Sequence, residues 1–89
     1  MLGTGVMTVR SRLRVLIASE NLKRAQAGLD ALTQQQIAAE AGLPLSVVNG
    51  LVTNRAGRVD FKTLDRLCRY FKCQPGDLLT YEPEDGEGF

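Results

Sequence analysis

The chain has 89 residues, of which 44% are hydrophobic and 24% charged, a composition typical of one small folded domain. It has no histidine and only two cysteines, which excludes a zinc site of the usual ligands and removes the commonest general base, so we expect no metal, no cofactor and no enzymatic activity. The net charge of +1 is the sum of two unlike regions, because four of the 10 acidic residues lie in positions 82–89, and the basic remainder suits a polyanionic partner.

Both ends of the chain are predicted to be unstructured. Residues 1–8 contain two glycines and show no amphipathic period, and residues 82–89 combine acidic residues with proline and glycine. Neither segment can bury enough apolar surface to fold alone. The sequence therefore predicts one domain over residues 9–81.

The first helix is predicted from apolar residues that recur at the spacing of one buried helix face. Residues 23–32, which follow it, favour helix through their alanines but are interrupted by Gly28. They either extend the first helix or form a separate turn, and the sequence leaves both possibilities open. The apolar positions that define the first helix are Val9, Leu13, Leu16 and Ile17.

Two short helices joined by a turn are predicted next. Thr33 and Gln36 have the spacing of a capping box, in which each side chain binds the backbone N–H of the other. Gly42 ends this helix at the position where a left-handed backbone is usual, and Pro44 suits the first turn of the next helix. The apolar positions of the pair are Ile37, Ala38, Ala41, Leu45, Val48, Leu51 and Val52.

A basic loop over residues 54–59 precedes two further helices. Asp60 is the expected N-cap of the first, and Pro75 the expected start of the second. We find no strand pattern, so the predicted fold class is all-α, a compact bundle of five helices. The apolar positions of these last helices are Phe61, Leu64, Leu67, Cys68, Phe71, Leu78 and Leu79.

Two short helices joined through Gly42 are typical of a helix-turn-helix, whose second helix lies in the DNA major groove. Residues 9–81 also resemble the Cro and phage-repressor-like (XRE-type) helix-turn-helix regulators, above all in residues 59–68 (VDFKTLDRLC) and 73–79 (CQPGDLL). The resemblance implies a lambda-repressor-like domain of five helices, in which the second and third form the helix-turn-helix. Compared with the family pattern, residues 22–32 look like an insertion, for which no role is implied.

The resemblance also implies which residues contact DNA. Thr33 and Gln34, where free backbone N–H groups favour an anion, are expected to face phosphates. The loop after the third helix is expected to approach the DNA backbone through Asn54, Arg55 and Arg58. The positions expected to face the bases are Leu45, Ser46, Val47, Asn49 and Thr53, of which Ser46 and Asn49 carry groups suited to base edges.

These observations predict a sequence-dependent DNA-binding transcriptional regulator, with repression as the expected mode. We expect it to bind double-stranded DNA as a homodimer, in the cytoplasm and associated with the nucleoid. The dimer interface is expected either in residues 22–32 or in the last helix with Leu78, Leu79 and Tyr81. No membrane partner is expected, because apolar runs such as residues 15–18 fall far short of the ~18 residues needed to span a bilayer.

The alternative is a protein-interaction module, such as an antitoxin or an accessory subunit, that docks a partner through the apolar third helix. That helix contains no Arg, Lys or Gln, which favours this alternative.

Overall fold

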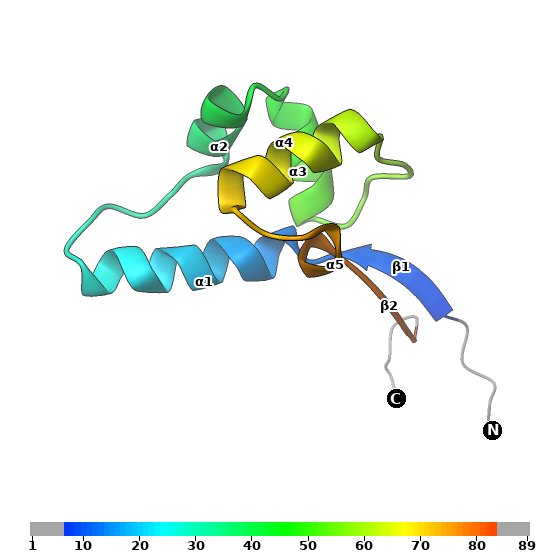
Figure 1. The fold of residues 1–89 in the computed structure, drawn as a ribbon, viewed down its shortest axis with the longest axis horizontal. Coiled ribbons are helices and arrows are strands. Elements are labelled where there is room, and N and C mark those ends of the chain that lie inside the picture. Colours follow the sequence, from blue (N-terminus) through cyan, green and yellow to red (C-terminus); the bar gives the residue numbers. More distant parts are fainter. Residues whose placement is uncertain (1–6, 84–89) are drawn as a thin grey trace.

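A computed structural model describes residues 7–83 as five helices and one two-stranded sheet (Figure 1). Helices α2, α3 and α4 gather on one side of the long helix α1, and the two strands form a ribbon that leaves the body at the start of α1. The elements in chain order are β1 (Met7–Ser11), α1 (Leu13–Gln26), α2 (Gln34–Ala41), α3 (Leu45–Val52), α4 (Phe61–Phe71), α5 (Pro75–Leu78) and β2 (Leu79–Pro83).

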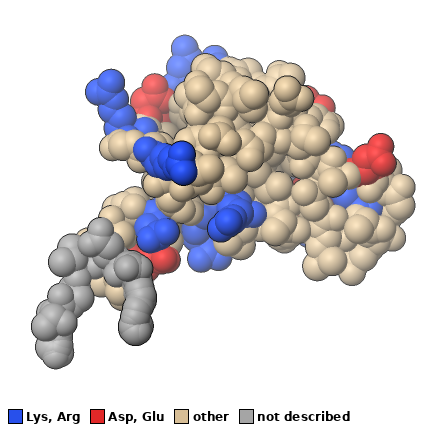
Figure 2. All heavy atoms as spheres, turned by 180° about the vertical axis from the view of Figure 1, so that it is seen from behind, with Lys and Arg blue, Asp and Glu red and all other residues tan. Residues whose placement is uncertain are grey.

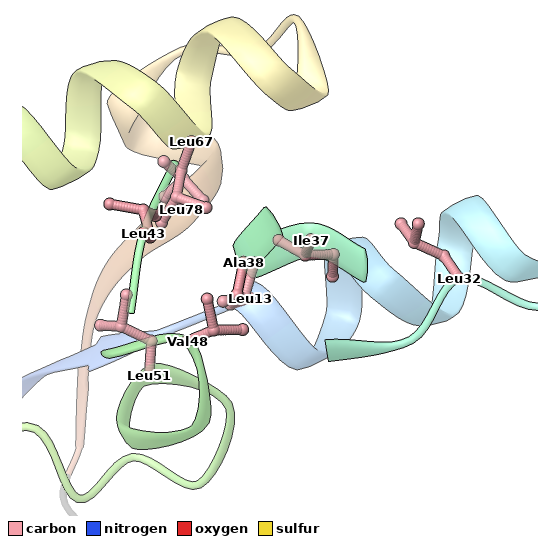
Figure 3. Close-up of a cluster of buried hydrophobic side chains, with 9 residues drawn as sticks. All are labelled: Leu13, Leu32, Ile37, Ala38, Leu43, Val48, Leu51, Leu67 and Leu78. Carbon is pink, nitrogen blue, oxygen red and sulfur yellow. The ribbon is translucent and has the colours of Figure 1, made fainter. Parts of the chain in front are cut away.

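One cluster of aliphatic side chains holds the helices together (Figure 3). Its fully buried members come from four different helices: Leu13, Ile37, Val48 and Leu67. Because each of these side chains is enclosed by its neighbours, α2 and α3 are fixed against α1 and α4. The other buried aliphatic residues are Leu32, Ala38, Leu43, Leu51 and Leu78.

The ends of α2 and α3 follow the sequence pattern with two differences. Thr33 Oγ1 accepts a hydrogen bond from the Gln36 backbone N–H at 3.1 Å, and Gly42 ends α2 with a φ of 73°. The Gln36 side chain donates to Glu40 Oε2 at 3.1 Å instead of completing the predicted capping box. Pro44 is the N-cap of α3 rather than a residue of its first turn.

Residues 23–32 extend the first helix and then turn back. α1 continues to Gln26, and Gly28 turns the chain with a φ of 77°. Asn21 fixes the returning chain, because its Oδ1 accepts from the Leu32 N–H at 2.6 Å and its Nδ2 donates to the Leu32 carbonyl at 3.3 Å. We call residues 18–31 the arm, since this segment extends beyond the other helices (Figure 1).

The predicted all-α class is wrong in one respect, because β1 and β2 pair antiparallel, with Val9 opposite Tyr81. The sequence pattern assigns these residues to a helix or to unstructured ends because each strand has only five residues and its partner lies at the other end of the domain. Residues 1–6 and 84–89 of the predicted ends lie outside the described residues. The residues corrected to strand are those of 7–11 and 79–83, among them Met7, Thr8, Val9, Leu79, Tyr81, Glu82 and Pro83.

Phe61 is a second correction to the predicted core. As the first residue of α4 it is 87% exposed, because the beginning of the helix projects past the core while the apolar spacing continues. The other aromatic residues of α4 do pack, since Tyr70 and Phe71 meet edge to face with ring centroids 5.1 Å apart.

Candidate nucleic-acid interface

The turn between α2 and α3 is held rigidly. The Leu43 N–H donates to the Ala38 carbonyl at 2.9 Å, and the Leu43 side chain is buried. Arg66 of α4 donates a hydrogen bond to the Gly42 carbonyl. Ala38 is itself buried where the two helices meet, so a larger side chain there would force them apart. The outer surfaces of α2 and α3 therefore keep a fixed relation to each other.

A shallow depression joins the start of α2 to the outer face of α3. Across it, Asn49 Nδ2 donates a hydrogen bond to Gln34 Oε1 at 3.1 Å. The first N–H groups of α2 have no acceptor within the helix and so are suited to an anion. The lining residues are Thr33, Gln34, Gln35, Leu45, Ser46 and Asn49.

A second depression adjoins the first at Ser46. The Gly50 carbonyl accepts hydrogen bonds from the N–H groups of Arg55 at 2.9 Å and Ala56 at 3.1 Å, which folds the loop back against α3. Arg55 and Arg58 are exposed, and neither forms an ion pair with any residue from 7 to 83. The lining residues are Ser46, Val47, Gly50, Leu51, Arg55, Ala56, Arg58, Val59, Asp60 and Thr63.

Asp60 places one carboxylate beside these arginines. Its Oδ1 accepts a hydrogen bond from the Thr63 backbone N–H at 2.8 Å, which caps α4. Hydrogen bonds from the side chain and the backbone of Thr63 hold the pKa of the Asp60 carboxyl below its ordinary value. Because the Asp60 carboxylate caps α4, the guanidinium groups of Arg55 and Arg58 remain available to bind an external anion.

The predicted contact residues line these two depressions, except for Thr53 and Asn54. The Thr53 hydroxyl donates to the Asn49 carbonyl at 2.9 Å, within the last turn of α3. Asn54 has a φ of 58° and binds the backbone of Ser11 with both ends of its amide. Its Oδ1 accepts from the Ser11 N–H at 2.7 Å and its Nδ2 donates to the Ser11 carbonyl at 3.2 Å. Asn54 thus joins β1 to the end of α3.

Replacing Asn54 by Ala is expected to lower the free energy of unfolding by about 1–3 kcal/mol, because Ser11 loses both hydrogen bonds and alanine is strained at a positive φ. Asn54→Gly tolerates that φ, so the difference between the two variants measures the backbone strain of alanine less the larger entropy that glycine loses on folding. Urea unfolding followed by circular dichroism gives both values. If Asn54→Ala is as stable as the parent, the bonds to Ser11 contribute nothing.

Seven lining residues lie outside the predicted contact residues, and they are Gln35, Gly50, Leu51, Ala56, Val59, Asp60 and Thr63. Gln35 could have been found, because it follows Gln34 at the exposed start of a helix. Ala56 has no polar group to indicate a role. Thr63 is buried in the first turn of α4, and its position beside the loop depends on tertiary packing.

The charges are unevenly spread over the surface. On the face in Figure 2, Lys and Arg lie mainly toward the end from which the ribbon leaves, whereas the arm at the opposite end carries both acidic and basic side chains. Within residues 7–83, no helix is both long and apolar enough to cross a bilayer. The same residues contain no group of three His, Cys, Asp or Glu side chains that could hold a metal ion.

Similarity to known proteins extends over most of the chain. Residues 12–84 match the family described as the Cro/C1-type HTH DNA-binding domain. A stretch of 54 residues is 28% identical to YozG, an uncharacterized HTH-type transcriptional regulator of Bacillus subtilis (strain 168). That stretch spans 61% of this chain and 64% of YozG, so the match covers less than two thirds of the relative's length.

Proposed function

Because this chain belongs to the Cro/C1-type helix-turn-helix family, we propose that it is a DNA-binding transcriptional regulator whose helix α3 enters the major groove. The observation that carries the proposal is the joint surface of α2, α3 and the following loop. On this surface, amide and hydroxyl groups adjoin Arg55 and Arg58, which have no ion-pair partner within residues 7–83.

Phosphate contacts are proposed on both sides of α3. On one side, Thr33 and Gln34 present the start of α2, whose free N–H groups suit a phosphate oxygen. On the other side, Arg55 and Arg58 supply positive charge. Because the two depressions meet at Ser46 on α3, these contacts would flank the helix and set its position in the groove.

Asn49 is the proposed reader of base sequence. Bidentate recognition of adenine uses the amide oxygen as acceptor and one amide N–H as donor. The bond to Gln34 occupies only one N–H of Asn49, so the other N–H and the oxygen stay available. Gln34 thus holds Asn49 in place and leaves it one donor and one acceptor. Ser46 can add a hydrogen bond, and Leu45 and Val47 can contact thymine methyl groups.

A titration with mixed-sequence duplex DNA at two salt concentrations tests the proposal. We expect binding that weakens steeply as salt rises, because phosphate contacts release counterions. Undetectable binding even at low salt would contradict the proposal. That result would favour the protein-interaction module, for which the exposed Leu45 on α3 would be the docking side chain.

Replacing Asn49 by Ala is expected to reduce the preference between DNA sequences by about 1–3 kcal/mol, with a smaller effect on binding to mixed sequence. Selection from a random duplex pool, repeated with the variant, measures the preference. Gln35→Ala is the matched control, because Gln35 lines the same depression but is not bonded to Asn49. An unchanged preference in Asn49→Ala would exclude Asn49 as a reader.

We also propose that the regulator acts as a homodimer and represses by occupying its site. A single small domain offers few phosphate contacts, so its affinity alone would be low. Two copies of α3 placed about one DNA turn apart would raise both affinity and selectivity. A transcription assay on a selected site measures the sign of regulation, and increased transcription would contradict repression.

A further inference from the structure

Helix α1 is apolar on two opposite faces. Its inner face carries Leu13, Leu16 and Ile17, which belong to the core or pack against it. On the outer face, Val15 and Leu22 are 49% and 62% exposed. The stripe is completed by Ala18 and Ala25, which are also exposed, and we call these four residues the outer stripe.

The outer stripe has the spacing of a helix-pairing surface. Its members are separated by three, four and three residues, which places them in one row along the helix. A helix that only covers a core needs one apolar face, with polar residues opposite. The packing within residues 7–83 therefore leaves the outer stripe unexplained.

We propose that the outer stripe is the dimer interface, on which α1 of a second copy of this chain packs antiparallel about a two-fold axis at residue 20. In this register, Leu22 of one copy faces Ala18 of the other, and Val15 faces Ala25. The same contacts recur on the other side of the axis, as a two-fold interface requires. The inference rests on the proposed homodimer and specifies its location.

The side-chain sizes favour this occupant. Large and small residues alternate along the stripe, so in the antiparallel register each layer joins one large and one small side chain. A parallel pair would instead place Leu22 opposite Leu22 and Ala18 opposite Ala18. Layers of two large side chains would then alternate with layers of two small ones, and the two helices could not pack evenly along their length. The stripe is therefore complementary in shape to its own reversed copy.

The charges at the edges of the stripe are compatible with self-association. The flanking positions carry only one charged side chain, Arg14, which in this register lies near the neutral Asn21 of the other copy. Arg24 is on the inner side, where it pairs with Glu20 at 3.7 Å. No charges of like sign are therefore brought together at the flanks.

The first test places a charge in the stripe. Leu22→Lys is expected to raise the dimer dissociation constant at least about tenfold, because the ammonium group would face Ala18 of the other copy. Val9→Lys is the matched control, since Val9 is also 62% exposed but lies in the ribbon. Sedimentation equilibrium of the full chain without DNA gives the constants, and circular dichroism checks the fold. A monomeric parent, or a dimer dissociated by Val9→Lys and not by Leu22→Lys, would overturn the interface.

The second test examines the register. Ala18→Leu is expected to weaken the dimer about tenfold, because two leucines then meet in one layer. Adding Leu22→Ala to the same chain exchanges the large and small residues, and should restore the dissociation constant to within about threefold of the parent. A double variant that stays as weak as Ala18→Leu would contradict the proposed register.

These measurements separate the interface from the proposed DNA binding. A parent chain that is monomeric but binds duplex DNA with the expected salt dependence would overturn the interface and the homodimer, and leave the proposed DNA binding intact. A parent chain whose dimer is dissociated by Leu22→Lys, but which itself binds no DNA at low salt, would support the interface and overturn the proposed DNA binding.

Discussion

The Leu13→Ala variant is expected to be less stable than the parent by about 2–5 kcal/mol, because it leaves a cavity at a fully buried position. Leu13 begins α1 at the junction between the ribbon and the helices. Next to it, the Arg12 N–H donates to the Leu78 carbonyl at 2.7 Å, so little local collapse can fill the space. A loss of this size is a large part of the stability of a small domain.

Urea unfolding followed by circular dichroism measures the effect of Leu13→Ala. Leu29→Ala is the control, since this leucine is 59% exposed and its truncation should change the stability by only about 0.5 kcal/mol. Similar values for the two variants would mean that Leu13 is not enclosed as described.

Removing both loop arginines is expected to have the largest effect on DNA affinity. If Arg55 and Arg58 each contact one phosphate, the double variant Arg55→Ala/Arg58→Ala should reduce the slope of log K against log salt by about 2. At low salt the affinity should fall roughly 100- to 10,000-fold, because hydrogen bonds to charged groups contribute about 1.5–3 kcal/mol each, or about 3–6 kcal/mol for the two. Fluorescence anisotropy with one labelled duplex over several salt concentrations gives both quantities.

The control for this variant removes the same net charge elsewhere. Lys23 lies on the arm, and Arg69 is an exposed residue of α4 that pairs with Asp65 at 3.0 Å. The variant Lys23→Ala/Arg69→Ala should retain nearly the parental slope. Equal slopes for the two double variants would show that the net charge of the protein matters and the position of the loop arginines does not.

The helical core could be predicted from the sequence because the apolar spacing within each helix marks its buried face. Leu13, Ile37, Val48 and Leu67 all occur at positions where the apolar spacing alone requires burial. Leu32 and Leu43 are buried too, but they lie in connecting segments, where no periodicity distinguishes a buried leucine from an exposed one.

The ribbon could not be predicted because its stability depends on distant partners. Val9 continues the spacing of the first helix, and only its pairing with Tyr81 makes it a strand residue. Asn54 shows the same limitation at the candidate site. As a polar residue after α3 it suits a phosphate contact, but in the structure its side-chain amide is hydrogen-bonded to the Ser11 backbone.

The rest of the candidate site followed from family resemblance more than from residue chemistry. The helix-turn-helix spacing indicates which positions of α3 face outward, whereas the bond between Gln34 and Asn49 depends on the angle at which α2 and α3 pack. Spacing along the chain does not specify that angle.

The ribbon also implies an order of folding. Pairing Met7 with Pro83 closes a loop that includes nearly all of the described chain, which is the costliest closure in this fold. The helices depend mainly on nearer contacts and can pack before β2 has left the ribosome. We therefore expect β1 to stay unpaired until β2 is available, so that the pairing of the two strands is the last step of folding.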